Sequence, residues 1–275
     1  MLTALNPASN TRAFAEMFGL LNRHRALTIE LTKRDIGERY AGQVLGSVWA
    51  IGHPIALMTI YVIVFTQVWR EDMPPGMPLD RTAYLVAGIA PWMAFQESMM
   101  LGTTSITGKS NLVKQVVFPI EVLPIKGVLI SLVSQLVMTA LLLGFITIQF
   151  RTAYWTWALI PVAISIQAVG MAGVALFLSS VGVYFRDLKD FVQVFSTACM
   201  FGIPLFYFPP TGGPGWWIVN LNPFTHLLAV QRDVLFFGAI TQPMSWVILT
   251  VLSCAAFCLG YRTFRRLKPM FGNVL

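Results

Sequence analysis

Six long apolar runs constrain this chain more than any other feature of its sequence. They cover residues 45–69, 83–103, 124–150, 154–185, 191–208 and 244–264. Because an α-helix needs about 20 mostly apolar residues to cross a bilayer, the runs predict an all-α integral membrane protein with six transmembrane helices. The fourth run is too long for one upright helix, so we expect that helix to tilt or protrude.

The composition argues against a soluble enzyme. Only 11% of the residues are charged and 56% are hydrophobic, whereas a soluble domain carries about a quarter charged residues. The chain starts without the basic, apolar and small-residue pattern of a cleavable signal peptide. We therefore expect a single transmembrane domain over residues 1–275, with an N-terminal segment at 1–44, a six-span core at 45–264 and a tail at 265–275.

The placement of lysine and arginine predicts the orientation of the spans. Only Arg70, Arg81, Arg151 and Arg232 fall on one side of them. The other basic residues lie in the N-terminal segment, in the loops after the second and fourth runs, and at the C-terminal end, with Lys126 just inside the third run and Arg262 at the end of the sixth. Because basic loops are retained in the cytoplasm, we expect both termini to be cytoplasmic. This distribution explains most of the net charge of +7, so we expect no nucleic-acid partner.

The triplet Gly108-Lys109-Ser110 resembles the end of a nucleotide-binding P-loop. That motif also requires a glycine five positions before Gly108, where this chain has Thr103, and a strand before the loop. The triplet instead lies in a short cytoplasmic loop between two predicted spans. We therefore expect this chain to bind no cofactor, and ATP and Mg²⁺ to be bound by a separate subunit. The three cysteines have no metal-ligand spacing, so no metal site is expected.

Two cytoplasmic segments are candidates for contact with such a subunit. Residues 14–44 place Phe14, Met17, Phe18 and Leu21 on one helical stripe, which predicts an amphipathic helix in the headgroup layer. An ordinary basic flank of the first span is the alternative. The loop "KSNLVKQVVFPIEVLP" mixes polar and apolar residues before prolines that interrupt the helix, and it is either a docking loop or a plain connector.

The external segment at residues 209–243 is predicted to form a helical hairpin before the sixth span. Asn222 and Pro223 are typical of a helix start, and Gly238 is typical of a helix end. Between them the chain sets Phe224, Leu227, Leu228 and Leu235 against His226, Gln231, Arg232 and Asp233. Such an amphipathic helix is too polar to span, so we expect it to lie at the outer interface or to re-enter the membrane.

Three stretches carry a resemblance to a known family: "TKRDIGERYAGQVLGSVWAIGHP", "NLVKQVVFPIEVLP" and "LNPFTHLLAVQRDVLFFG". They are similar to the permease subunit of ABC-2 type exporters for polysaccharides, and the resemblance covers nearly the whole chain. It implies a homodimer in the bacterial inner membrane, two docked ABC ATPase subunits, and a lipid-linked polysaccharide substrate such as O antigen or capsule.

The resemblance also implies that the first cytoplasmic helix and the loop after span two couple ATP hydrolysis to transport. The corresponding residues here are Arg34, Asp35, Arg39, Tyr40, Lys109, Asn111, Lys114, Gln115 and Phe118. Gln115 departs from the pattern, because relatives commonly have a second basic residue at that position.

Aromatic residues are candidates for lining a sugar channel, since rings stack on the apolar faces of sugars without fixing their register. The candidates on spans one and five are Trp49, Tyr61, Phe65, Trp69, Phe195, Phe201, Phe206 and Tyr207. The candidates for closing the outer mouth are Trp216, Trp217, Asn222, Phe224 and Arg232. The alternative is that these rings form the aromatic belts found at both membrane surfaces.

Two other classes of function stay open at this point. A secondary transporter would use Glu97, an acid within the second span, to relay protons or ions. The other class is an intramembrane enzyme, such as a serine protease or a lipid-linked glycosyltransferase. A serine protease would need a serine and histidine pair, and His24, His53 and His226 are the three histidines available.

Overall fold

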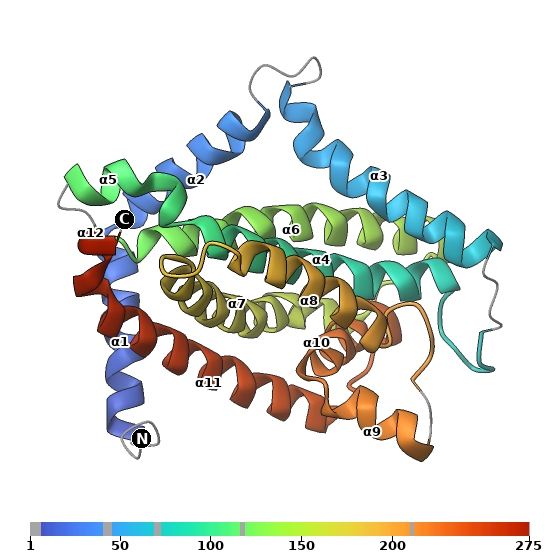
Figure 1. Ribbon diagram of the computed structural model, residues 1–275. Coiled ribbons are helices and arrows are strands. Elements are labelled where there is room, and N and C mark those ends of the chain that lie inside the picture. The colour runs from blue at the N-terminus through green and yellow to red at the C-terminus, as the bar shows by residue number, and fades with distance from the viewer. Residues whose placement is uncertain (1–6, 41–45, 69–72, 116–118, 210–211, 275) are drawn as a thin grey trace.

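The computed structural model describes residues 7–40, 46–68, 73–115, 119–209 and 212–274, and within these ranges it contains helices and connecting segments but no strand (Figure 1). The longer elements that follow the apolar runs are α3 (Trp49–Ile63) with the π-helical turn η3 (Val64–Val68), α4 (Arg81–Thr104), α6 (Val122–Phe150), η5 (Trp155–Leu159) with α7 (Ile160–Gly182), α8 (Leu188–Gly202) and α11 (Pro243–Leu267). The predicted all-α class is confirmed.

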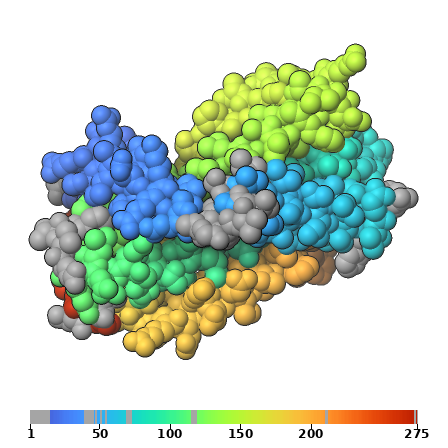
Figure 2. Space-filling view, turned by 90° about the horizontal axis from the view of Figure 1, so that it is seen from above, coloured from blue at the N-terminus to red at the C-terminus, as the bar shows by residue number. Residues whose placement is uncertain are grey.

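Three described segments are long and apolar enough to cross a membrane: Val122–Phe150, Trp155–Gly182 and Pro243–Met270. Helix α3 and its π-helical turn contribute a shorter apolar helix at Ile55–Val68. Seen from above in Figure 2, α2 and α3 lie end to end across one face of the molecule, with α6 and α7 on one side and α8 on the other.

The helices outside the apolar runs gather at the two ends of the bundle (Figure 1). Helices α1 (Pro7–Arg23), α2 (Arg25–Tyr40), α5 (Ser110–Gln115) and α12 (Phe271–Val274) lie at one end, and α9 (Gly213–Leu221) and α10 (Pro223–Arg232) lie toward the other. The remaining turns are η2 (Gly46–Val48), η4 (Thr107–Lys109), η6 (Asp233–Phe237) and η7 (Lys268–Met270). The segments expected in the cytoplasm thus share one end.

Helices α7 and α11 approach closely because glycines face each other between them. A Cβ atom placed on Gly173 would lie 2.3 Å from the backbone of Ala256 and Phe257, and one on Gly260 would meet the Gly173 carbonyl oxygen. Small residues allow such close backbone contact where apolar surfaces alone give no preference for one partner over lipid.

Amide side chains connect four helices in the centre of the bundle. Gln135 of α6 and Gln167 of α7 exchange hydrogen bonds of 3.0 and 2.9 Å. Gln231 of α10 donates to Gln167 at 2.9 Å, and Gln167 donates to the carbonyl oxygen of Pro91 in α4 at 3.2 Å. These bonds satisfy amides that would be costly to bury alone.

The N-terminal segment differs from the single amphipathic helix predicted for residues 14–44. It forms two helices, α1 and α2, which meet at His24. Met17 packs in a core with Phe264 and Phe271, whereas Phe18, predicted on the same stripe, is 74% exposed. Neighbouring residues on a helix point about 100° apart, so α1 cannot turn both side chains toward α11.

The fifth apolar run was predicted to be helical through residue 208, and this is wrong. Helix α8 ends at Gly202, and Ile203 has an extended backbone with φ −104° and ψ 152°. The cause is Pro204, because a proline disfavours helical geometry in the residue before it.

The start and the end of the predicted external helix are confirmed. The Asn222 side chain accepts a hydrogen bond of 3.1 Å from the Phe224 amide, Pro223 is the first helical residue, and Gly238 ends η6 with φ 65°. The helix does not divide into a polar and an apolar face by burial, because Leu227, Leu228 and Leu235 are buried and so are its polar residues His226, Gln231, Arg232 and Asp233. Each of these polar residues has a hydrogen-bond partner inside the protein.

Candidate functional site

A charged groove lies at the end of the bundle that carries the termini. Its volume is about 330 Å³, and its walls come from α2, from η4 and α5, and from the first turn of α6. The residues that line it are Leu31, Arg34, Asp35, Gly108, Lys109, Ser110, Asn111, Leu112, Leu123 and Lys126. The structure therefore brings together the two segments that the resemblance implicates in coupling.

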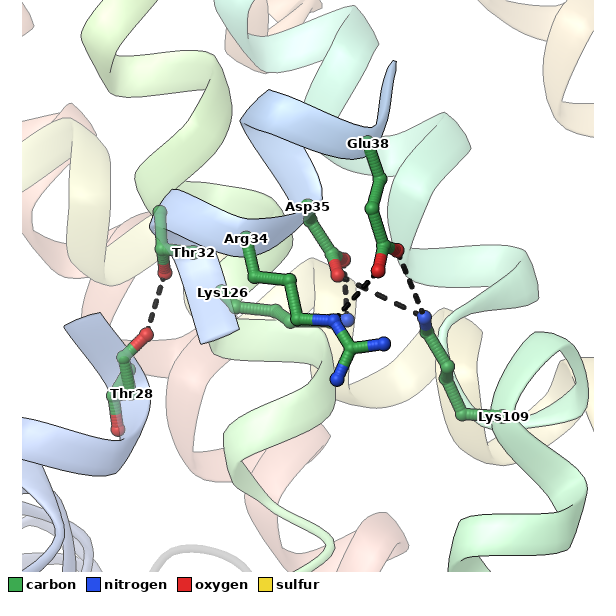
Figure 3. Close-up of polar contacts among 7 residues, drawn as sticks. All are labelled: Thr28, Thr32, Arg34, Asp35, Glu38, Lys109 and Lys126. Carbon is green, nitrogen blue, oxygen red and sulfur yellow. Dashed lines mark hydrogen bonds and ion pairs between the residues drawn. The ribbon is translucent and has the colours of Figure 1, made fainter. Parts of the chain in front are cut away.

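Five charged side chains form a connected network in this groove (Figure 3). Asp35 makes an ion pair with Lys126, and the Lys109 ammonium lies 3.8 Å from Asp35 and 3.7 Å from Glu38. The Arg34 guanidinium donates a 2.6 Å hydrogen bond to Glu38. This bond raises the pKa of Arg34 and lowers the pKa of Glu38. With three cations and two anions, the network is electropositive.

Lys126 and Glu38 belong to the network although they were not predicted as site residues. Lys126 is 5% exposed, and a buried ammonium requires an anionic partner, so the pair with Asp35 holds α2 against α6. A lysine just inside an apolar run was the available signal for Lys126. The spacing of four residues from Arg34 was the signal for Glu38.

The other predicted coupling residues are placed less centrally. Lys114 is exposed on α5. Arg39 and Tyr40 are the last residues of α2, and Gln115 is the last residue of α5. Phe118 lies outside the described residues.

Four of the predicted channel aromatics meet in one cluster. Phe65 stacks on Phe206 with ring centroids 4.1 Å apart and an angle of 8° between the planes. Tyr61 and Phe201 approach the same ring at 5.6 and 6.4 Å. The cluster joins α3 and η3 to α8 and to the non-helical segment after it, residues 203–208, and the half-buried Tyr207 follows Phe206 directly.

The remaining aromatic candidates are not part of this cluster. Phe195 is exposed on α8, and Trp49 is exposed at the start of α3. Trp216 and Trp217 are exposed on α9. Trp69 lies outside the described residues.

Arg232, predicted at the outer mouth, is 3% exposed and joins α10 to the aromatic cluster. Its guanidinium lies 3.6 Å above the Tyr84 ring and donates to the Tyr84 hydroxyl at 2.8 Å. It also donates to the carbonyl oxygens of Pro204 at 2.7 Å and Leu205 at 3.1 Å. These bonds hold the non-helical segment that presents Phe206.

Phe224 and His226 also turn inward from α10. The Phe224 ring makes edge contacts with Trp92 and Phe95 of α4, at centroid distances of 5.1 and 5.0 Å. His226 is hydrogen-bonded to Ser245 at 3.1 Å. Both residues are buried, and neither lines the charged groove. This histidine and serine pair therefore anchors the hairpin to α11.

Glu97 borders a second cavity, of about 240 Å³, between α3, α4 and α6. His53, Gln96 and Gln135 share its lining. Within the described residues, no group of three or more histidine, cysteine, aspartate or glutamate side chains could hold a metal ion.

The helical bundle with its charged groove is the transmembrane domain of a transporter: the chain belongs to the ABC-2 type transporter family, whose sequence profile matches residues 26–236. It is 26% identical to the O-antigen export system permease protein RfbA of Klebsiella pneumoniae over 258 residues, which cover 90% of this chain and 95% of that protein. It is 30% identical to the RfbA protein of Myxococcus xanthus over 187 residues, covering 68% and 70%. It is 23% identical to the polysialic acid transport protein KpsM of Escherichia coli over 250 residues, covering 87% and 93%.

Membership in this family confirms the resemblance found in the sequence. Together with the long apolar helices, it indicates a multi-pass protein of the bacterial inner membrane that works with an ABC ATPase.

Proposed function

We propose that this chain is the channel-forming permease subunit of an ATP-driven exporter that carries a lipid-linked polysaccharide, such as O antigen or capsule, across the inner membrane. The observation that carries this proposal is the end-to-end similarity to O-antigen export permeases, which spans nine-tenths of the chain. Two copies of the chain form the channel, and two ABC ATPase subunits dock to them.

In this proposal six segments span the membrane: α3 with η3, α4, α6, η5 with α7, α8, and α11. Helix α8 has 15 residues and is about 22 Å long, less than the roughly 30 Å of hydrocarbon. The non-helical segment at residues 203–208 makes up the difference. Helices α9 and α10 with η6 form an external re-entrant hairpin, which the internal hydrogen bonds of Gln231 and Arg232 support.

The charged groove is the proposed docking site for the ATPase subunit, which binds ATP and Mg²⁺. Two features support this assignment. The groove lies at the same end of the bundle as α1 and α12 (Figure 1), where we place the cytoplasm. Asp35 of α2 pairs with Lys126 of α6 in this groove, so a partner that moves α2 also moves α6.

The aromatic cluster of Tyr61, Phe65, Phe201 and Phe206 is the proposed sugar contact, facing a path between two copies of the chain. A polymer must slide through its channel, and tight binding at any point would stall it. Stacked rings bind sugar faces weakly and without a fixed register. Through Arg232 the external hairpin is connected to this cluster, which suits a role for the hairpin in closing the outer mouth.

The test is reconstitution of the chain with its ATPase in liposomes. We expect no ATP hydrolysis by the chain alone, and Lys109→Ala should leave the nucleotide affinity of the complex unchanged. Glu97→Gln separates this account from a secondary transporter, because an ATP-driven exporter should keep its activity in that variant. Nucleotide binding by the isolated chain, or loss of all transport in Glu97→Gln, would contradict the proposal.

A further inference from the structure

A second groove lies where α1 meets the end of α11, apart from the charged groove and from the aromatic cluster. Its volume is about 580 Å³. Its lining includes Glu16, Arg23, His24, Glu121, Arg265 and Lys268. No proposed step of transport uses these residues.

Glu121 is the unusual member of this lining. It is 4% exposed, and one carboxylate oxygen accepts a 2.7 Å hydrogen bond from the Lys268 ammonium. The other oxygen is buried without a hydrogen-bond partner among the residues that the structure describes. A buried carboxylate oxygen in this state is costly, and Glu121 is part of the groove's lining, so a ligand whose hydrogen-bond donors reach this oxygen would satisfy it.

The cations of the groove give it a mixed character. Arg265 pairs with Glu16, and Lys268 pairs with Glu121, while the exposed Arg23 adds a further positive charge. Three cationic and two anionic side chains suit a ligand that carries one anionic and one cationic group close together. A purely anionic ligand would face both glutamates.

The groove lies at the depth of the lipid headgroups. Helix α11 has 25 residues, which span about 37 Å, whereas the hydrocarbon layer is about 30 Å thick. Its last turn, with Arg265, therefore reaches the membrane surface on the side of the termini. The exposed Phe18 on the neighbouring α1 is suited to insertion between lipids, as in an interfacial helix.

We propose that this groove binds the headgroup of an aminophospholipid from the cytoplasmic leaflet. The phosphodiester lies against Arg23, Arg265 and Lys268, and the primary ammonium group donates hydrogen bonds to Glu121. Phosphatidylethanolamine has this chemistry. The inference rests on the proposed orientation of α11 but does not depend on the transported substrate, and it gives α1 a fixed attachment to both α11 and the bilayer.

Native mass spectrometry of the full-length chain in detergent, with phosphatidylethanolamine, phosphatidylcholine and phosphatidylglycerol added in equal amounts, tests the proposal. Phosphatidylcholine keeps the phosphate but its methylated nitrogen has no hydrogen to donate. We expect phosphatidylethanolamine to bind about tenfold more tightly, the effect of one charge-assisted hydrogen bond. Glu121→Gln should remove this preference, and Arg23→Gln should weaken all three lipids.

Arg266→Gln is the matched control, because Arg266 is exposed in the same turn of α11 but does not line the groove. It should bind lipids as the native chain does. Equal binding of the three lipids by the native chain, or a preference for phosphatidylglycerol, would overturn the proposal even if Glu121→Gln does not fold.

Soluble glycerophosphoethanolamine separates a lipid site from a small-molecule site. If it displaces the lipid at equal concentration, the groove recognises a soluble ligand and the lipid assignment is wrong. Cross-linking of Arg23→Cys to an ATPase subunit, with no lipid retained, would make the groove a protein contact instead. Lipid retention is measured without ATP or polysaccharide, so its failure would leave the proposed export function standing.

Discussion

The ion pair between Asp35 and Lys126 should determine how firmly α2 is attached to the bundle. Lys126 is 5% exposed and the Asp35 side chain is 21% exposed. Asp35→Asn keeps the shape of the side chain but leaves a buried ammonium without its anion. Breaking a buried pair costs about 3–5 kcal/mol. Because water reaches Asp35, we expect Asp35→Asn to lower the free energy needed to release α2 from the bundle by the smaller of these values, about 3 kcal/mol.

Replacing the lysine of the pair instead of the aspartate should weaken the attachment of α2 less. Lys126→Met removes the buried charge and keeps an apolar chain of similar length, while Asp35 still has water and the Lys109 ammonium at 3.8 Å. We expect Lys126→Met to lower the free energy of α2 release by about 1 kcal/mol. The double variant should be more stable than Asp35→Asn alone, because it removes the unpaired charge as well as its partner.

Hydrogen exchange of the α2 amides, in the detergent-purified chain, measures these differences. A cost of 3 kcal/mol corresponds to roughly a 150-fold increase in the population with α2 released. Arg34→Gln is the control, because it breaks only the exposed bond to Glu38, which contributes less than about 1 kcal/mol. If Asp35→Asn exchanges no faster than Arg34→Gln, or if the double variant is the least stable of all, the Asp35–Lys126 pair does not hold α2 in place.

Three further predictions concern the bundle and the aromatic cluster. Arg232→Met removes the donor to the carbonyl oxygens of Pro204 and Leu205 and to the Tyr84 hydroxyl, so unfolding should become easier by about 3 kcal/mol or more, seen as a lower melting temperature in detergent; an unchanged melting temperature would show that these bonds do not stabilise the bundle. Gly173→Ala should lower the melting temperature because the new methyl meets the α11 backbone at 2.3 Å, whereas Gly144→Ala, with nothing within 4 Å, should not. Tyr61→Ala should slow export at normal protein level and normal ATPase binding, while Tyr61→Phe, which keeps the ring, should not; equal export by the two variants would show that the ring is not a sugar contact.

The positions of the long helices could be predicted because the length of an apolar run carries that information directly. The ends of the external helix were also predictable, since Asn222, Pro223 and Gly238 act through local backbone geometry. The end of α8 was missed although its cause is local. Hydropathy reports the apolar character of residues 203–208 but not the restriction that Pro204 places on Ile203.

The inward orientation of α10 could not be predicted from the sequence. The partners of its polar residues come from distant segments: Arg232 bonds to Tyr84 of α4 and to Pro204, and Gln231 bonds to Gln167 of α7. In the same way Lys126 was counted as a loop charge that sets orientation. Its pairing with Asp35 depends on tertiary packing that brings α2 onto α6.

The proposed export path should operate only together with an ATPase. The most direct measurement uses inside-out liposomes that contain the chain together with its ATPase, and follows the uptake of a lipid-linked polysaccharide into the protected lumen. We expect uptake that requires ATP, Mg²⁺ and both subunits, and that is slowed by Tyr61→Ala. Uptake by the chain alone, or uptake driven by a proton gradient without ATP, would contradict it.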